Sequence, residues 1–179
     1  AASTAEYAGN WNHWAFVKNA AEGSMKIYLN GELWHSGNGK SKTMAGITRF
    51  ILGGNKSTHP ERSYDGCIDE FRVFKSALSQ EEIQTCMYIE YNNMQSHWDD
   101  LSVYYPMNSM NSGILPDQSS NTNHAHAIGM PRLKEYAGFE KYRSATILNY
   151  RSMTVFEQGS FSQEDSIIWH TDSVPAEQI

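Results

Sequence analysis

The adjacent carboxylates Asp69 and Glu70 are the first residues to consider, because carboxylates serve as general acid and base in hydrolysis. Retaining glycoside hydrolysis needs two carboxyl groups about 5–5.5 Å apart, on either side of the bond that breaks. Consecutive residues of a strand point to opposite faces, so Asp69 and Glu70 do not fit this requirement. No Glu-x-Asp-x-Glu or Glu-x-Asp-x-x-Glu pattern occurs in the chain. We therefore expect no catalytic residue and no enzymatic activity.

A turn-rich segment carries the best candidates for a metal site. Asp117, Asn121 and Asn123 offer the carboxylate and amide oxygens that calcium prefers, and calcium takes six to eight oxygen ligands. An Asx-turn network, in which these side chains bond their own backbone, explains the same residue types. Both interpretations stay open, and calcium is the one cofactor that the sequence leads us to consider.

The two cysteines, Cys67 and Cys86, lie among apolar neighbours. They are interpreted either as two buried thiols or as one disulfide that joins a strand to the helix after it. A disulfide requires Cα atoms within about 7 Å, which sequence spacing does not reveal. Both alternatives stay open.

Aromatic side chains near predicted turns and strand ends are the candidates for contact with a ligand. Trp14 and Trp34 occupy strand positions and are better explained by packing. The remaining candidates for ligand contact are Trp11, His13, His59 and Tyr64.

Short alternating apolar runs separated by turn residues predict strands through most of the chain. Asn30-Gly31, between two such runs, is a strong hairpin signal, because both turn positions need positive φ. The pattern indicates an all-β sandwich or jelly roll. The expected strands are residues 14–18, 25–29, 32–35, 49–52, 65–75, 101–106, 124–128, 145–149, 153–157 and 166–170.

One short helix is expected after the strand at 65–75. Ser79 and Glu82 form a capping box, which predicts a helix from Gln80 to about Tyr91. Alternation divides the preceding strand into two faces, one with Cys67, Asp69, Phe71 and Val73 and the other with Ile68, Glu70, Arg72 and Phe74. Of the two carboxylates, we expect one to bond loop amides and the other to pair with Arg72 or Lys75.

Composition limits the function classes that are open to the chain. Its 179 residues are 40% hydrophobic and 19% charged, which is typical of a globular protein. A formal net charge of -6 argues against a general nucleic-acid binder. Apolar runs fall far short of the roughly 20 residues of a membrane helix, so no membrane insertion is expected. The first residues lack the pattern of a signal peptide.

Several segments, in their order and spacing, resemble the C-terminal half of a laminin G-like domain of the concanavalin A-like lectin/glucanase superfamily. The most specific are the strand Gly66-Cys67-Ile68-Asp69-Glu70-Phe71-Arg72-Val73-Phe74 and the Ala77-Leu78-Ser79 segment that follows it. The resemblance runs from Trp11 to about Tyr91. Such domains are similar in fold to pentraxins, which implies an antiparallel jelly-roll sandwich with one short helix.

A second segment resembles the opening of another such domain. It comprises residues 101–108 and 117–124, with Ser120 and Thr122 where glycines are usual. No family pattern continues after Pro131. We therefore predict residues 1–92 as the C-terminal part of a jelly roll that is incomplete at its N-terminus. Residues 93–179 are predicted as a smaller β-rich extension, and the chain as a piece of a longer modular protein.

The resemblance implies a non-catalytic binding or adhesion module of a large extracellular or cell-surface protein. Its partner would be a glycan or a protein surface, besides the rest of a longer chain. Two alternatives stay open. One is a structural spacer or assembly segment that is completed by another part of the protein or by a partner chain. The other is an accessory domain of a secreted hydrolase.

Overall fold

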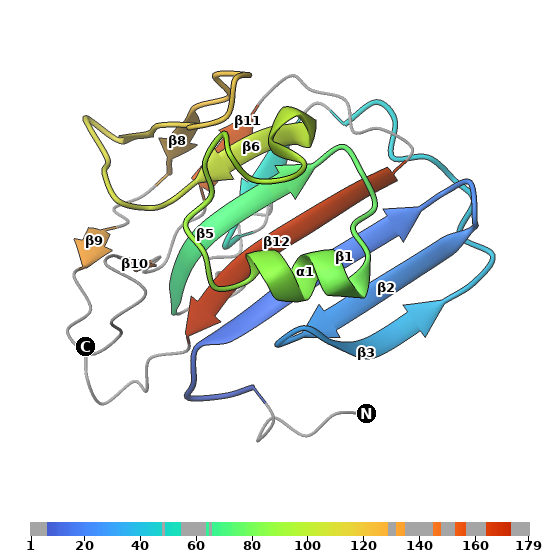
Figure 1. Ribbon diagram of the computed structural model, residues 1–179. Coiled ribbons are helices and arrows are strands. Elements are labelled where there is room, and N and C mark those ends of the chain that lie inside the picture. Colours follow the sequence, from blue (N-terminus) through green and yellow to red (C-terminus); the bar gives the residue numbers. More distant parts are fainter. Residues whose placement is uncertain are drawn as a thin grey trace.

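The computed structural model describes residues 7–47, 49–54, 64, 66–128, 132–134, 145–147, 153–156 and 164–172. These residues form antiparallel sheets with a single short α-helix, which confirms the expected fold class (Figure 1). The elements are β1 (Asn12–Asn19), β2 (Ser24–Leu29), β3 (Glu32–Gly37), β4 (Phe50–Leu52), β5 (Cys67–Phe74), α1 (Gln80–Cys86), η3 (Trp98–Asp100), β6 (Leu101–Tyr105), β7 (Ile114–Leu115), β8 (Ala125–Ala127), β9 (Arg132–Lys134), β10 (Ala145–Ile147), β11 (Met153–Phe156) and β12 (Glu164–Asp172).

The strands form one large and one small sheet. The large sheet has the order β3-β2-β1-β12-β5-β10-β9, and β6 also pairs with β5. The small sheet has the order β4-β11-β8-β7. In Figure 1, β12 (dark red) lies between β1 (blue) and β5 (green), although it comes from the far end of the chain. The fold is thus closed by pairing between distant parts of the sequence.

The turn between β2 and β3 has the conformation that Asn-Gly predicts. Asn30 and Gly31 adopt φ values of 52° and 81°, so the hairpin prediction is confirmed. The backbone N–H of His13 donates to Oδ1 of Asn30 at 2.9 Å. In return, the N–H of Asn30 donates to the carbonyl of His13 at 2.8 Å. These bonds fix the turn against β1.

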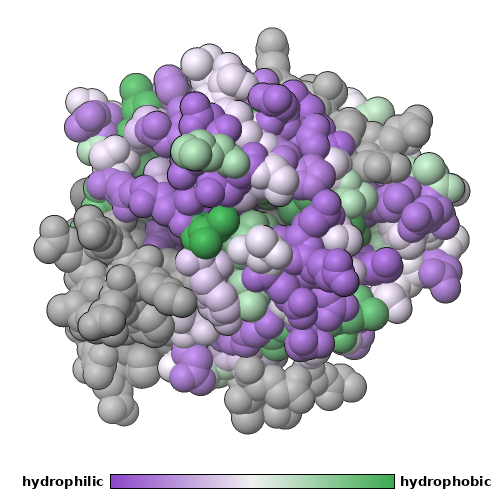
Figure 2. All heavy atoms as spheres, viewed as in Figure 1, coloured by the Kyte–Doolittle hydropathy of each residue, from purple (hydrophilic) through white to green (hydrophobic). Residues whose placement is uncertain are grey.

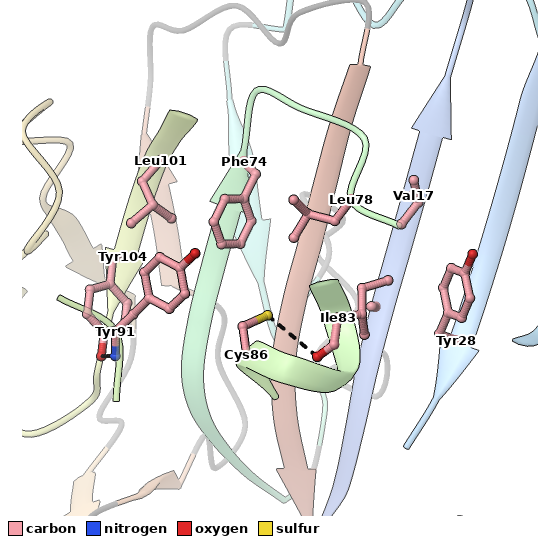
Figure 3. Packing of buried hydrophobic residues seen from close by; sticks show 10 residues of the cluster. Val17, Tyr28, Phe74, Leu78, Ile83, Cys86, Tyr91, Leu101 and Tyr104 are labelled. Carbon is pink, nitrogen blue, oxygen red and sulfur yellow. Dashed lines mark hydrogen bonds between the residues drawn. The ribbon is translucent and has the colours of Figure 1, made fainter. Parts of the chain in front are cut away.

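Two apolar cores lie on opposite faces of the large sheet. The first fills the space between the sheets and includes Leu52, Phe71, Val103, Leu115 and Ala125. The second lies under α1 and includes Ala15, Val17, Tyr28, Phe74, Ile83 and Cys86 (Figure 3). Full burial of a side chain such as Ile83 contributes roughly 1.5–3 kcal/mol, which holds the short helix on the sheet.

A β-bulge in β5 changes the expected assignment of faces. Ile68 lies in the same core as Phe71 and Val73, so its expected place on the opposite face is wrong. The register with β12 shifts between Ile168 and His170, and Glu70 adopts a φ of 52°. One extra residue in a strand reverses the alternation on either side of it.

Helix α1 begins as predicted and ends early. The Ser79 capping box is confirmed, because its hydroxyl accepts the N–H of Glu82 and its own N–H donates to the Glu82 carboxylate at 2.7 Å. The predicted end near Tyr91 is wrong, since the helix stops at Cys86. Beyond this end the Cys86 carbonyl accepts the guanidinium of Arg72 at 2.9 Å and the N–H of Ile89 at 3.5 Å, and not the N–H of a continued α-helical turn.

Candidate functional site

The adjacent carboxylates of β5, Asp69 and Glu70, make their contacts within the protein. Arg72 is fully buried, and its guanidinium donates to the carboxylate of Glu70, which confirms the expected pairing. The hydroxyl of Tyr104 donates to the same carboxylate at 3.1 Å, and Tyr104 and Tyr91 both lie against the guanidinium. Glu70 therefore has a cation and a hydroxyl as neighbours, in a buried site where it is 7% exposed.

Asp69 is also buried, with 2% of its surface exposed. Its Oδ1 accepts the backbone N–H of Glu70 at 3.0 Å, so it bonds an amide of its own strand rather than of a loop. Burial, and then the charge of Glu70, raise the pKa of Asp69 to about 8. This carboxyl group is consequently protonated at neutral pH in the folded protein.

The carboxylate of Asp117 organises the loop between β7 and β8. Its Oδ1 accepts the backbone N–H groups of Tyr104 and Ser119, at 2.8 and 2.9 Å. Its Oδ2 accepts the hydroxyl of Ser119 and the N–H of Asn123, both at 2.8 Å. Asn121 and Asn123 donate their side-chain amides to carbonyls of β6, at Leu101 and Ser102 respectively.

This donor set fits a loop-organising carboxylate better than a calcium ligand. Each oxygen of Asp117 already accepts two hydrogen bonds, which saturate its lone pairs. A calcium ion instead needs several oxygens turned toward one point. The described residues also include no group of three or more His, Cys, Asp and Glu side chains arranged to hold a metal. Calcium at Asp117, Asn121 and Asn123 stays a prediction, and the geometry does not support it.

The four candidates for ligand contact fall in different environments. Trp11 is half-buried just before β1, while the ring of His13 is buried within β1 at 1% exposure. Tyr64 is half-buried and packs against the core between the sheets. His59 lies outside the described residues. The buried ring of His13 does not present itself to a ligand, and ligand contact at the other three residues stays a prediction.

The two cysteines are buried and are not bonded to one another. Cys67 begins β5 and pairs with Ile147 and Asp172 in the sheet. Cys86 ends α1, where its Sγ contacts the carbonyl of Ile83 at 3.5 Å (Figure 3). The structure thus describes two buried thiols, as in the first interpretation, and a disulfide between them stays a prediction.

The sequence explained Trp14 and Trp34 by packing alone, and it did not predict that they belong to a group of aromatic side chains on β1, on β3 and before β1. We call it the aromatic cluster, and it comprises Tyr7, Trp14, Phe16, Trp34 and His35. The rings of Trp14 and Trp34 meet edge to face with centroids 5.3 Å apart. Tyr7 lies 5.9 Å from Trp14 and 6.5 Å from Trp34. His35 is exposed and the other four are half-buried, so the cluster is partly open to solvent.

Two features of the strands bring these rings together. Ala15 and Val17 pack under α1, so the alternating residues Trp14 and Phe16 point to the other face of the large sheet. The register between β2 and β3 shifts after Ile27, because Ile27 pairs with His35 and Tyr28 pairs with Leu33. Trp34 is therefore an extra residue of β3, next to His35. The period-two spacing of Trp14 and Phe16 was visible in the sequence, but the bulge at Trp34 was not.

The aromatic cluster lies beyond the region that the small sheet covers. Among the described residues, the core between the sheets draws on β4 to β8 and on neighbouring loops, but not on β1, β2 or β3. The opposite face, seen from the α1 side in Figure 2, is mostly hydrophilic where it is coloured, with small separate hydrophobic areas. The cluster is therefore an aromatic feature of the described residues that packing does not fully bury.

Residues 1–84 match the laminin G-like family model of the concanavalin A-like lectin/glucanases superfamily. The expected resemblance is thus confirmed over this part of the chain, and it indicates a carbohydrate- or protein-binding module. The match ends before Leu101, so the resemblance of the second segment stays a prediction, as does the boundary between residues 92 and 93. No curated protein and no solved structure matches the chain. None of the described helices has the length and apolar character needed to span a bilayer.

Proposed function

We propose that this chain is a non-catalytic binding module that recognises a glycan, and that the aromatic cluster provides the contact surface. Indole and phenol rings present flat apolar faces together with polar edges, which suits them to ligands that are apolar on one side and hydroxylated on the other. Trp14 and Trp34 are held at fixed angles by neighbouring rings, so little side-chain entropy is lost on binding. The partly exposed pair of indoles is the observation that carries the proposal.

We propose that the module is non-catalytic because the carboxylates of β5 are engaged or buried. Glu70 is engaged by Arg72 and Tyr104, and Asp69 is buried. Neither of them faces a substrate together with a second carboxylate. Laminin G-like domains are generally non-catalytic and usually extracellular, and we extend both properties to this chain. An extracellular or cell-surface multidomain protein is the proposed context.

A glycan array probed with the full chain tests the proposal, with and without calcium. We expect binding to a defined set of glycans that calcium does not change. Trp34→Ala should weaken this binding at least tenfold. Leu33→Ala, which alters the exposed neighbour of Trp34 on β3, should leave it within twofold and serves as the matched control.

Three results would contradict the proposal. Equal effects of the two substitutions would remove the aromatic cluster from the contact. A chain that binds no glycan but captures a protein in a pull-down would assign the module to protein recognition instead. Calcium-dependent binding would restore the Asp117 loop as the site to examine.

A further inference from the structure

The large sheet contains a position that only the far end of the chain fills. β1 and β5 are not paired with each other, and β12 lies between them, antiparallel to both. Every residue of β1 from Asn12 to Asn19 has a partner in the segment from Glu164 to Thr171. On its other side, β12 pairs with β5 from Cys67 to Phe74 across the bulge. The first 92 residues alone would leave a gap one strand wide.

The surroundings of β5 explain why such a gap cannot stay open. All eight residues of β5 are buried, with one apolar core on each side of the sheet. Backbone N–H and C=O groups that are buried without partners carry a free-energy penalty of about 1–3 kcal/mol each. Without β12, the edge of β5 that faces β1 would hold a row of such groups. A strand must occupy this place for the sheet to be stable.

The second half of the chain also joins the sheet on the other side of β5. There β6 pairs with β5 from Phe71 to Phe74, and β10 pairs with Cys67 and Ile68. The β6 segment is the one whose sequence resembles the opening of a laminin G-like domain. The opening-like segment therefore pairs directly with the closing-like segment that precedes it in the chain.

We propose that β1 and β5 form a strand-accepting slot whose occupant is β12 of the same chain, so that the described strands from β1 to β12 fold as one cooperative unit. This inference concerns assembly and does not depend on the proposed glycan contact. It also favours completion of the sheet by the chain itself over completion by a partner.

Engineered disulfides in the full chain test the register of the slot. Val17 and Ser166 lie directly opposite each other in β1 and β12. We expect Val17→Cys with Ser166→Cys to form a bridge within one monomer under mild oxidation. The control pair, Val17→Cys with Thr171→Cys, is five residues out of register, or roughly 17 Å, and should not form one. Peptide mapping distinguishes the new bridge from any that involves Cys67 or Cys86.

The other outcomes of this experiment overturn the proposal. A bridge between two chains would show that a second copy supplies the strand. No bridge in either pair, or equal bridging in both, would show that β12 does not lie beside β1 in this register.

Hydrogen exchange of two proline variants tests cooperativity independently. Ile168 lies opposite both Ala15 and Arg72, so Ile168→Pro should remove protection from amides of β1 and β5 together, at least tenfold in exchange rate. Ser36→Pro, in the edge strand β3, should affect β2 and spare β5. Global loss of protection in the Ile168→Pro variant would also support one unit. Retained protection in β1 and β5 would contradict it.

Discussion

The imidazole of His97 lies 2.8 Å from the carboxylate of Glu82, measured from Nε2 to Oε1. Its other nitrogen, Nδ1, lies 2.9 Å from Oδ2 of Asp100. An ionised carboxylate only accepts hydrogen bonds, so contact with both carboxylates requires both ring nitrogens to carry a proton. His97 therefore contacts both carboxylates in its charged form. These two contacts connect the first turn of α1 to the turn before β6.

The first prediction concerns how the stabilising effect of these His97 contacts depends on pH. Burial alone would lower the pKa of His97, but its hydrogen bonds to Asp100 and Glu82 raise it overall. A raised folded-state pKa adds stability below the unfolded value, near 6.5, and this stability is lost as the pH rises through the folded value. The carboxylates of Glu82 and Asp100 are 41% and 43% exposed, so we expect an effect of only about 0.2–1 kcal/mol.

Urea unfolding at pH 5.5 and 8.5 measures this effect. His97→Asn keeps a residue that tolerates the positive φ of 63° and removes the charge. The variant should be less stable than the wild type at pH 5.5, with a smaller difference at pH 8.5. His126→Gln, at an exposed histidine of β8, is the control. A difference that grows with pH would contradict the prediction.

The second prediction concerns Asp69. Because its pKa is raised to about 8 by burial and by the charge of Glu70, it should lower the stability of the protein as the pH rises from about 4 to 8. Asp69→Asn keeps the oxygen that accepts the Glu70 N–H and cannot ionise. We expect this variant to equal the wild type near pH 4 and to exceed it by a few kcal/mol at pH 8.

The measurement is the free energy of unfolding of the wild type and of Asp69→Asn between about pH 4 and pH 8. Asp99→Asn, at an exposed carboxylate, is the matched control and should track the wild type at every pH. An Asp69→Asn variant that is less stable at pH 8 would show that the carboxylate is ionised and paired in the folded protein.

The third prediction concerns Gly31 in the hairpin turn. A Cβ at this position would lie 2.9 Å from Cγ of Gln84 and 3.1 Å from Sδ of Met87, besides requiring a φ of +81°. Gly39 has a φ of +69° but no atom within 4 Å of such a Cβ. Both alanine variants should lose roughly 1 kcal/mol from backbone strain, and Gly31→Ala should lose more. Equal melting temperatures for the two variants would show that the turn does not pack against α1.

The fourth prediction concerns the buried guanidinium. Arg72→Met leaves Glu70 without its cation and frees the carbonyls of Cys86 and Ile89. Loss of one partner from a buried ion pair is expected to reduce the free energy of unfolding by about 3–5 kcal/mol. Lys42→Met, at an exposed position, should change it by less than about 0.5 kcal/mol. A loss below about 1 kcal/mol for Arg72→Met would contradict the structural role assigned to this network.

Features that depend on neighbouring residues were predictable from the sequence. The Asn30-Gly31 turn follows from the positive φ that both positions need, and the start of α1 follows from the reach of Ser79 and Glu82 to each other's backbone. The sequence left two roles open for Asp117, and its four hydrogen bonds to the loop and to Tyr104 of β6 resemble the Asx-turn alternative, while calcium there stays a prediction.

Features that depend on distant pairing were not predictable. A glutamate with positive φ has no sequence signal, so the bulge at Glu70 and the resulting place of Ile68 were missed. The early end of α1 coincides with a hydrogen bond from Arg72, a residue of the preceding strand, to the last helical carbonyl. The aromatic cluster likewise depends on a bulge at Trp34, and the position of β12 depends on pairing across about 150 residues of chain.

The fate of a bound glycan tests the central claim most directly. The full chain is incubated with the glycan that it binds best, the complex is followed by tryptophan fluorescence, and the glycan is recovered and analysed by mass spectrometry. We predict saturable quenching whose midpoint Trp34→Ala raises at least tenfold, together with a glycan that is recovered intact. A cleaved or modified glycan, or quenching that Trp34→Ala leaves unchanged, would contradict the account.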